Sequence, residues 1–241
     1  MRGMCITSAA CIVLALCLPA HAEWVAGAYL GGAHTQNSDL LLRQPSLGTD
    51  LRFHNLAYSG NSFQGPLYYG AHGGYFFGRH WGIESEFTHL KVFTKVQEPA
   101  PVSGTLNGAL VNTVQPADLL VQRFSISHGV NLLMANVVFR QPLWHSLSEP
   151  LGRLLIDTRL GGGATIPHPE STIQGRADEH YQVGRPVFGA AAGAELRLWR
   201  RVYWQAEYKY TRSRQRVDVF SGTAETLLQS HHLATGPVIH F

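Results

Sequence analysis

Histidine gives this sequence most of its capacity for chemistry. Imidazole can ligate a metal ion, transfer a proton near neutral pH or contact a lipid phosphate. No two histidines have the spacing of a compact helical metal motif, so a metal site would have to assemble from different segments. An ordinary surface role is the alternative for each of them. Seven histidines lie at or beyond the predicted external ends of strands: His34, His89, His128, His168, His180, His231 and His232.

A second group of charged residues is expected to face the interior of the fold. The alternation of residues places acids and bases on the polar side of several segments. We expect them to pair as a structural salt-bridge network, with one carboxylate at the outer end serving a site as the alternative. The predicted acids are Glu84, Glu86, Asp157, Glu195 and Glu207, and the predicted bases are Arg153, Arg159, Arg197 and Lys209.

The segments that would position these groups have a period of two, which is typical of β-strands. In the clearest one, Trp204 and Tyr208 fall on one face and Gln205 and Glu207 on the other. One face suits lipid, and the other suits a polar interior. Eight such segments are predicted, each near the length that a tilted strand needs to cross a bilayer: 24–33, 67–77, 81–93, 129–140, 153–166, 186–198, 202–211 and 230–241.

The lengths of the connections separate a barrel from a soluble sandwich. Long connections at 34–66, 94–128, 167–185 and 212–229 alternate with shorter ones at 78–80, 141–152 and 199–201. This asymmetry is typical of outer-membrane barrels with external loops and periplasmic turns. Within the second external loop, prolines predict a mobile stretch from 97 to 122. The sequence therefore predicts an all-β fold, an eight-stranded antiparallel transmembrane β-barrel with long external loops.

The two ends of the chain agree with export to the cell outer membrane. An apolar run from Ile6 to Leu18, followed by Ala20-His21-Ala22, predicts a signal peptide over 1–22 and a barrel domain over 23–241. The three cysteines all lie in that leader, so no disulfide is expected. The final Phe241 resembles the signal read by the outer-membrane assembly machinery.

The composition argues against nucleic acid as a partner. The formal net charge is only +3, and no basic face is clustered as nucleic-acid binding requires. From the predicted barrel we expect a monomer surrounded by outer-membrane lipids. An interior filled by side chains disfavours a porin.

Four stretches carry a family resemblance: 62–70 (SFQGPLYYG), 81–92 (WGIESEFTHLKV), 128–136 (HGVNLLMAN) and 207–210 (EYKY). Together they resemble the lipid A oxidase family of outer-membrane barrels. The resemblance implies oxygen-dependent oxidation of the proximal glucosamine of lipid A to 2-aminogluconate.

The candidate catalytic residues are Glu86 and His89 at the end of segment 81–93, His128 and Asn131 at the start of the next, and Glu207. The first four would be neighbours across one hairpin. His89 and His128, with a carboxylate, could bind a divalent metal as cofactor and leave positions open for oxygen. Glu86 or Glu207 could take a proton from the sugar. The alternative is a non-enzymatic barrel that stabilises the envelope or binds ligands through its loops, because a fold alone does not determine function.

Overall fold

The structure is a computed structural model that describes residues 22–126, 129–144, 151–179 and 181–241. Within these ranges no helix has the length and apolar character needed to span a bilayer. Two short 3-10 turns occur, η1 (Pro45–Leu47) and η2 (Ala117–Leu119). The strands are β1 (Glu23–Thr35), β2 (Ser38–Gln44), β3 (Thr49–Leu56), β4 (Tyr58–Ser59), β5 (Tyr69–Phe76), β6 (Trp81–His89), β7 (Val92–Thr94), β8 (Pro99–Leu106), β9 (Ala109–Pro116), β10 (Val121–Ile126), β11 (Leu132–Leu143), β12 (Leu154–Thr165), β13 (Glu170–Ile173), β14 (Arg176–Glu179), β15 (Pro186–Trp199), β16 (Val202–Val219) and β17 (Gly222–His240).

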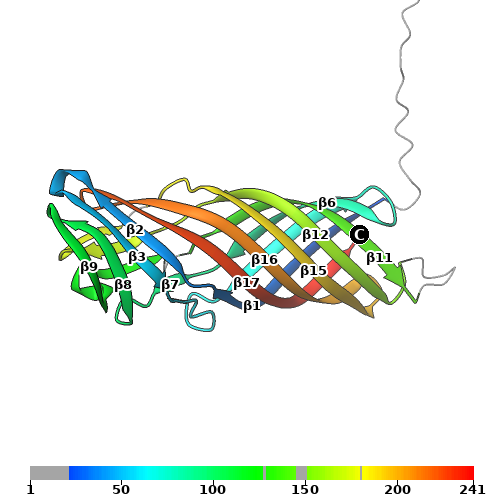
Figure 1. The fold of residues 1–241 in the computed structure, drawn as a ribbon. Helices are drawn as coiled ribbons and strands as arrows, with labels where there is room; N and C mark the ends of the chain where they lie inside the picture. The colour runs from blue at the N-terminus through cyan, green and yellow to red at the C-terminus, as the bar shows by residue number, and fades with distance from the viewer. Residues whose placement is uncertain (1–21, 127–128, 145–150, 180) are drawn as a thin grey trace, which may run out of the picture.

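Eight of the described strands close into an antiparallel barrel (Figure 1). They follow one another in the order β1-β5-β6-β11-β12-β15-β16-β17, and β17 pairs back with β1 from Val25↔His240 to Thr35↔Ser230. Closure leaves no unpaired edge within the bilayer. Each predicted segment coincides with one of these strands, so the predicted fold is confirmed.

The two faces of the barrel differ as a membrane requires. Along β16, Trp204 and Tyr208 are exposed, whereas Gln205 and Glu207 between them are buried. Exposed aromatic residues gather near both ends of the apolar surface, as in interfacial girdles. At the periplasmic end they include Trp24, Trp81, Phe139, Trp204 and Phe241, and toward the external end they include Tyr69, Phe188 and Tyr208.

The external segments are folded, which corrects two expectations. The stretch 212–229 is a continuation of β16 and β17, which stay paired as far as Val219↔Gly222. The stretch 97–122, predicted to be mobile, contains the β8–β9 hairpin. Its prolines are tolerated because Pro99 and Pro116 face each other at the open end, and Pro101 lies beyond Val102, the last β8 residue paired with β3.

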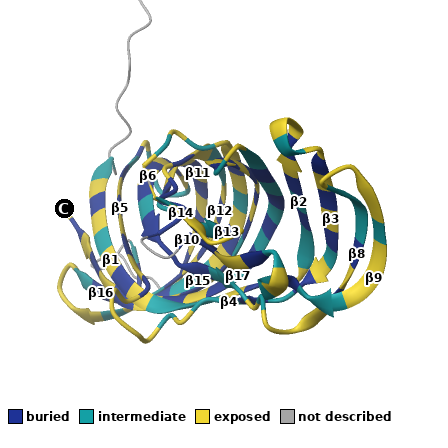
Figure 2. Cartoon of the chain, turned by 90° about the vertical axis from the view of Figure 1, so that its left-hand side faces the viewer, coloured by how far each residue is buried: buried dark blue, intermediate teal, exposed yellow. Residues whose placement is uncertain are grey.

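These elements form a cap over the end of the barrel that is predicted to be external (Figure 2). The protruding end of β17 pairs with β2, and β3, β8 and β9 extend the same sheet outward. A second, small sheet has the order β14-β13-β10-β7-β4. An apolar core between the two sheets holds the cap together, and its buried members include Leu40, Leu42, Leu51, Phe53, Val121, Phe124, Ile173 and Val217.

Candidate functional site

The lumen contains a charged layer between two apolar clusters. The external cluster includes Tyr29, Tyr68, Leu132, Met134 and Leu228. The periplasmic cluster consists of Val25, Phe76, Val138, Leu155, Tyr203 and Val238. The charged residues between them are therefore sealed by packed side chains from both ends.

Arg159 is the main cation of this layer. Its guanidinium donates to Glu84 at 2.9 Å, to Glu207 at 2.7 Å and to Asp157. A fourth carboxylate, that of Glu195, lies 3.9 Å away. The prediction that inward acids and bases pair across the lumen is thus confirmed for Arg159.

Lys209 is the second cation, and it holds Glu86. The Lys209 ammonium donates to Glu86 and lies 3.7 Å from Glu207. Glu86 also accepts from the Tyr29 hydroxyl at 2.6 Å and from the Asn136 amide at 3.0 Å. Both predicted carboxylates, Glu86 and Glu207, are therefore buried members of the ion-pair network.

The periplasmic end of the lumen departs from the prediction in two ways. Arg153, expected to face inward, is exposed because it lies just before β12 begins. Arg140 was missed as an inward base; it is buried and pairs with Glu23. His240 joins this end by bonding Glu195 at 2.7 Å.

His89 and Asn131 meet at the external rim. The His89 Nδ1 and Asn131 Oδ1 atoms are 2.8 Å apart, and the His89 ring stacks on Tyr69 with centroids 5.0 Å apart. Gly129 packs against the pair so closely that a Cβ atom there would lie 2.5 Å from the His89 ring. Its φ of +111° also favours glycine. Among the described residues, the buried His89 Nε2 has no hydrogen-bond partner.

The structure thus divides the predicted site in two. Glu86 and Glu207 share the lumen, whereas His89 alternates with Thr88 to the opposite, outward face of β6. His89 and Asn131 are brought together as predicted. His128 lies outside the described residues.

Sequence reasoning missed a second group in the cap. His168, noted only as a rim histidine, lies with Glu170 and Glu179, and their ligand atoms are all within 4.8 Å of one another. The His168 backbone N–H donates to the Gly129 carbonyl at 3.2 Å, which places this group beside the rim pair. In the sequence, His168 and Glu170 are two positions apart, and this spacing could have indicated the group. Glu179 could be found only through the pairing of β13 with β14.

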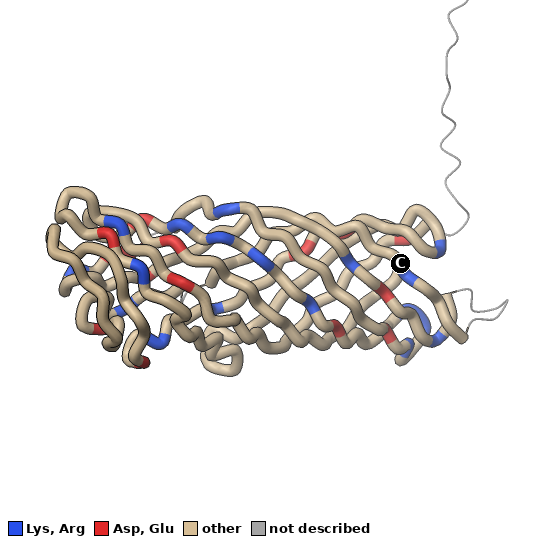
Figure 3. Tube along the Cα trace, in the orientation of Figure 1, with Lys and Arg blue, Asp and Glu red and all other residues tan. Residues whose placement is uncertain are grey.

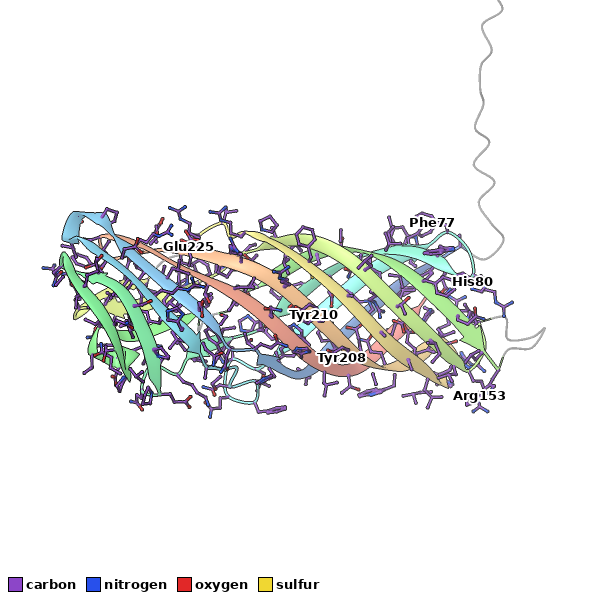
Figure 4. All side chains as sticks on the ribbon, viewed as in Figure 1. Phe77, His80, Arg153, Tyr208, Tyr210 and Glu225 are labelled. Atoms are coloured by element: carbon purple, nitrogen blue, oxygen red, sulfur yellow. The ribbon has the colours of Figure 1, made fainter. Side chains whose placement is uncertain are left out.

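An arginine stripe runs up the outside of β16. Arg212, Arg214 and Arg216 are exposed on the face that carries Tyr208 and Tyr210 farther down the strand. Figure 4 shows these tyrosines near mid-length of the molecule and Glu225 closer to the capped end. Basic residues are also spread over this external half in Figure 3. With Arg185 and Phe188, the stripe lines a shallow hollow of about 460 Å³.

The similarity to one solved structure with a TM-score above 0.5 supports the fold. No family model and no curated protein matches the chain. Among solved structures, it is similar to the outer membrane protein OprG from Pseudomonas aeruginosa, with 9% identity over 92% of this chain and 96% of that one, and a TM-score of 0.53. Neisserial surface protein A is 11% identical, with coverage of 91% and 99% and a TM-score of 0.43. The chain therefore has a closed eight-stranded antiparallel β-barrel fold that resembles the outer membrane protein OprG.

Proposed function

We propose that this outer-membrane barrel binds lipid A in the outer leaflet through the arginine stripe. The observation that carries the proposal is the change from tyrosine to arginine along one outward face of β16, between Tyr210 and Arg212. Tyrosines mark the interface between hydrocarbon and water. We therefore expect the arginines directly above them to lie at the height of lipid A phosphates.

The stripe has the charge and chemistry to hold phosphate. Residues two apart on a strand face the same side, so Arg212 and Arg214 repel each other unless an anion lies between them. The residues paired with them on β17, Gln229 and Leu227, carry no charge, and Glu225, which lines the same hollow, pairs with Arg216. Guanidinium binds phosphate through two parallel hydrogen bonds. Phe188, paired with Arg212 on β15, provides apolar surface for the start of an acyl chain.

The test uses the double variant Arg212→Gln/Arg214→Gln in the intact barrel. We expect its affinity for lipid A in detergent micelles to fall at least tenfold, since two charge-assisted contacts of about 1.5–3 kcal/mol each are lost. Arg200→Gln/Arg201→Gln, the same change of charge at the periplasmic turn, is the matched control. Equal affinity of both variants and the parent, or equal binding of dephosphorylated lipid A by the parent, would refute the proposal.

A second candidate function is oxidation of the proximal glucosamine of the bound lipid A. It is supported by the way three of the resembling stretches meet at the external rim. The Lys91 ammonium donates to the Gln64 carbonyl at 2.7 Å, and His89 contacts Asn131. His89 Nε2 suits the metal-ligand role predicted for it together with His128. Any metal there would supply oxygen activation, while Asn131 fixes the orientation of the His89 ring.

Mass spectrometry of lipid A from aerobically grown cells tests this activity. Cells with the parent protein should contain a species in which a proximal sugar that carries a free C1 hydroxyl has gained one oxygen atom as C1 becomes a carboxyl group. His89→Ala/His128→Ala should remove this species from a correctly assembled barrel. His80→Ala, at the periplasmic end in Figure 4, is the control. Lipid A that is unchanged by the parent would leave the non-enzymatic, lipid-binding barrel as the function.

A further inference from the structure

We propose that His168, Glu170 and Glu179 bind a divalent transition-metal ion in the extracellular cap. This site is separate from the metal ligands predicted at the rim, because the three-residue group does not include His89. It is also independent of lipid A binding, since the arginine stripe contributes no ligand.

The three side chains already have nearly the spacing of a coordination shell. One nitrogen and two carboxylate oxygens lie within 4.8 Å of one another, and His168 Nε2 is 3.5 Å from Glu179 Oε1. Ligands about 2.1 Å from a zinc-like ion are separated by roughly 3–4 Å. Closing the group around an ion therefore requires shifts of about 1 Å or less, which the exposed Glu179 side chain can make.

The backbone holds the ligands on a rigid support. Glu170 and Glu179 are directly paired residues of the β13–β14 hairpin. Its two-residue turn, Gln174-Gly175, has φ angles of 51° and 74°, as expected for the tight turn whose twist matches a hairpin. The His168 ring stacks on Tyr181 with centroids 4.0 Å apart. The imidazole is thereby oriented by a neighbour that is not itself a ligand.

The local charge favours a cation. Two carboxylates directly opposite each other on paired strands repel, and Glu170 is buried, which strengthens the effect. Arg123 pairs with Glu170. A divalent ion between the two carboxylates would reduce their mutual repulsion.

The donor set indicates the kind of metal. Calcium and magnesium prefer oxygen ligands alone, whereas one imidazole and two carboxylates suit zinc, manganese or iron(II). Three protein ligands leave coordination positions for water. The site is therefore expected to bind Zn²⁺ or Mn²⁺ in preference to Ca²⁺.

Isothermal titration of the tag-free, full-length mature barrel in detergent tests the site, with ZnCl₂, MnCl₂ and CaCl₂ as probes. The parent should bind Zn²⁺ at this site with affinity well above that for Ca²⁺, whether or not the rim binds a second ion. Glu179→Gln and His168→Ala should each weaken Zn²⁺ binding at least tenfold. Glu179 is exposed, so its near-isosteric replacement leaves folding intact.

Two control variants separate this site from general surface binding. Asp178→Asn makes the same change of charge on the same strand, and His54→Ala removes a histidine from the other sheet of the cap. Both should bind Zn²⁺ like the parent. The proposal is overturned if the parent takes up no Zn²⁺ at millimolar concentration, or if Glu179→Gln and His168→Ala bind it as the parent does.

Discussion

Replacing Arg159 with methionine should strongly destabilise the barrel. Methionine fills much of the space of the arginine side chain but leaves Glu84, Glu207 and Asp157 without their shared cation. Removing one partner of a buried ion pair costs about 3–5 kcal/mol, and three carboxylates are affected here, so we expect the upper part of that range. Urea titration of the barrel refolded in detergent, followed by tryptophan fluorescence, measures the loss.

Arg216→Met is the matched control for that change. Arg216 also faces a carboxylate, Glu225, at 3.6 Å, but both side chains are solvent-accessible. Exposed pairs contribute about 0–1 kcal/mol, so the control should unfold close to the parent. If Arg159→Met loses less than about 1 kcal/mol, the lumen network does not have the energetic role that its burial indicates.

Two further predictions concern the cap. Phe53→Ala should cost about 3–5 kcal/mol of cap stability, because the fully buried ring leaves a cavity, and faster proteolysis of the external segments with an intact membrane barrel would show it. Although burial raises the pKa of Asp39, hydrogen bonds from the Asn55 N–H and from Arg52 lower it overall below 3.8. A lowered carboxyl pKa contributes stability that is present above the unfolded pKa and is lost as pH falls, so Asp39→Asn should unfold more readily than the parent at neutral pH. The difference between the two should shrink as the pH falls below 3.8, and an equal difference at neutral and acidic pH would contradict this.

The membrane part of the fold was predictable because lipid imposes a strict pattern. Alternation along 202–211 gives the correct face for every residue of that segment, and the same rule could have found Arg140, which shares its parity with the inward Asn136 and Val138. Arg153 was misplaced because alternation ends where the strand ends. The alternation predicts which side chains are buried only where one face of a strand contacts lipid and the other faces the barrel interior.

The cap was not predictable in the same way. Its strands are short, and their pairings join distant segments, such as Leu42 with Ala224 and Phe53 with Val102. Leu51 and Phe53 flank the polar Arg52, but Leu40 and Leu42 flank another leucine, Leu41, and nothing in the sequence shows which strand each will meet. The rim pair His89–Asn131 followed from two adjacent barrel strands, whereas the contact of Glu170 with Glu179 depended on a hairpin inside a predicted loop.

The segment 181–185 links the two external sites that this fold creates. At one end, Tyr181 stacks on His168, and at the other, Arg185 lines the hollow beside the arginine stripe. Between them, the Gln182 side chain donates to the Arg216 carbonyl at 2.9 Å and accepts from the Asp218 N–H at 3.3 Å, which fixes the segment to the edge of β16. A lipid A molecule held by its phosphates on the stripe would therefore place its sugars near this segment and the cap. Because the lumen carboxylates are sealed by apolar clusters, chemistry on that headgroup would fall to the residues of the rim and the cap.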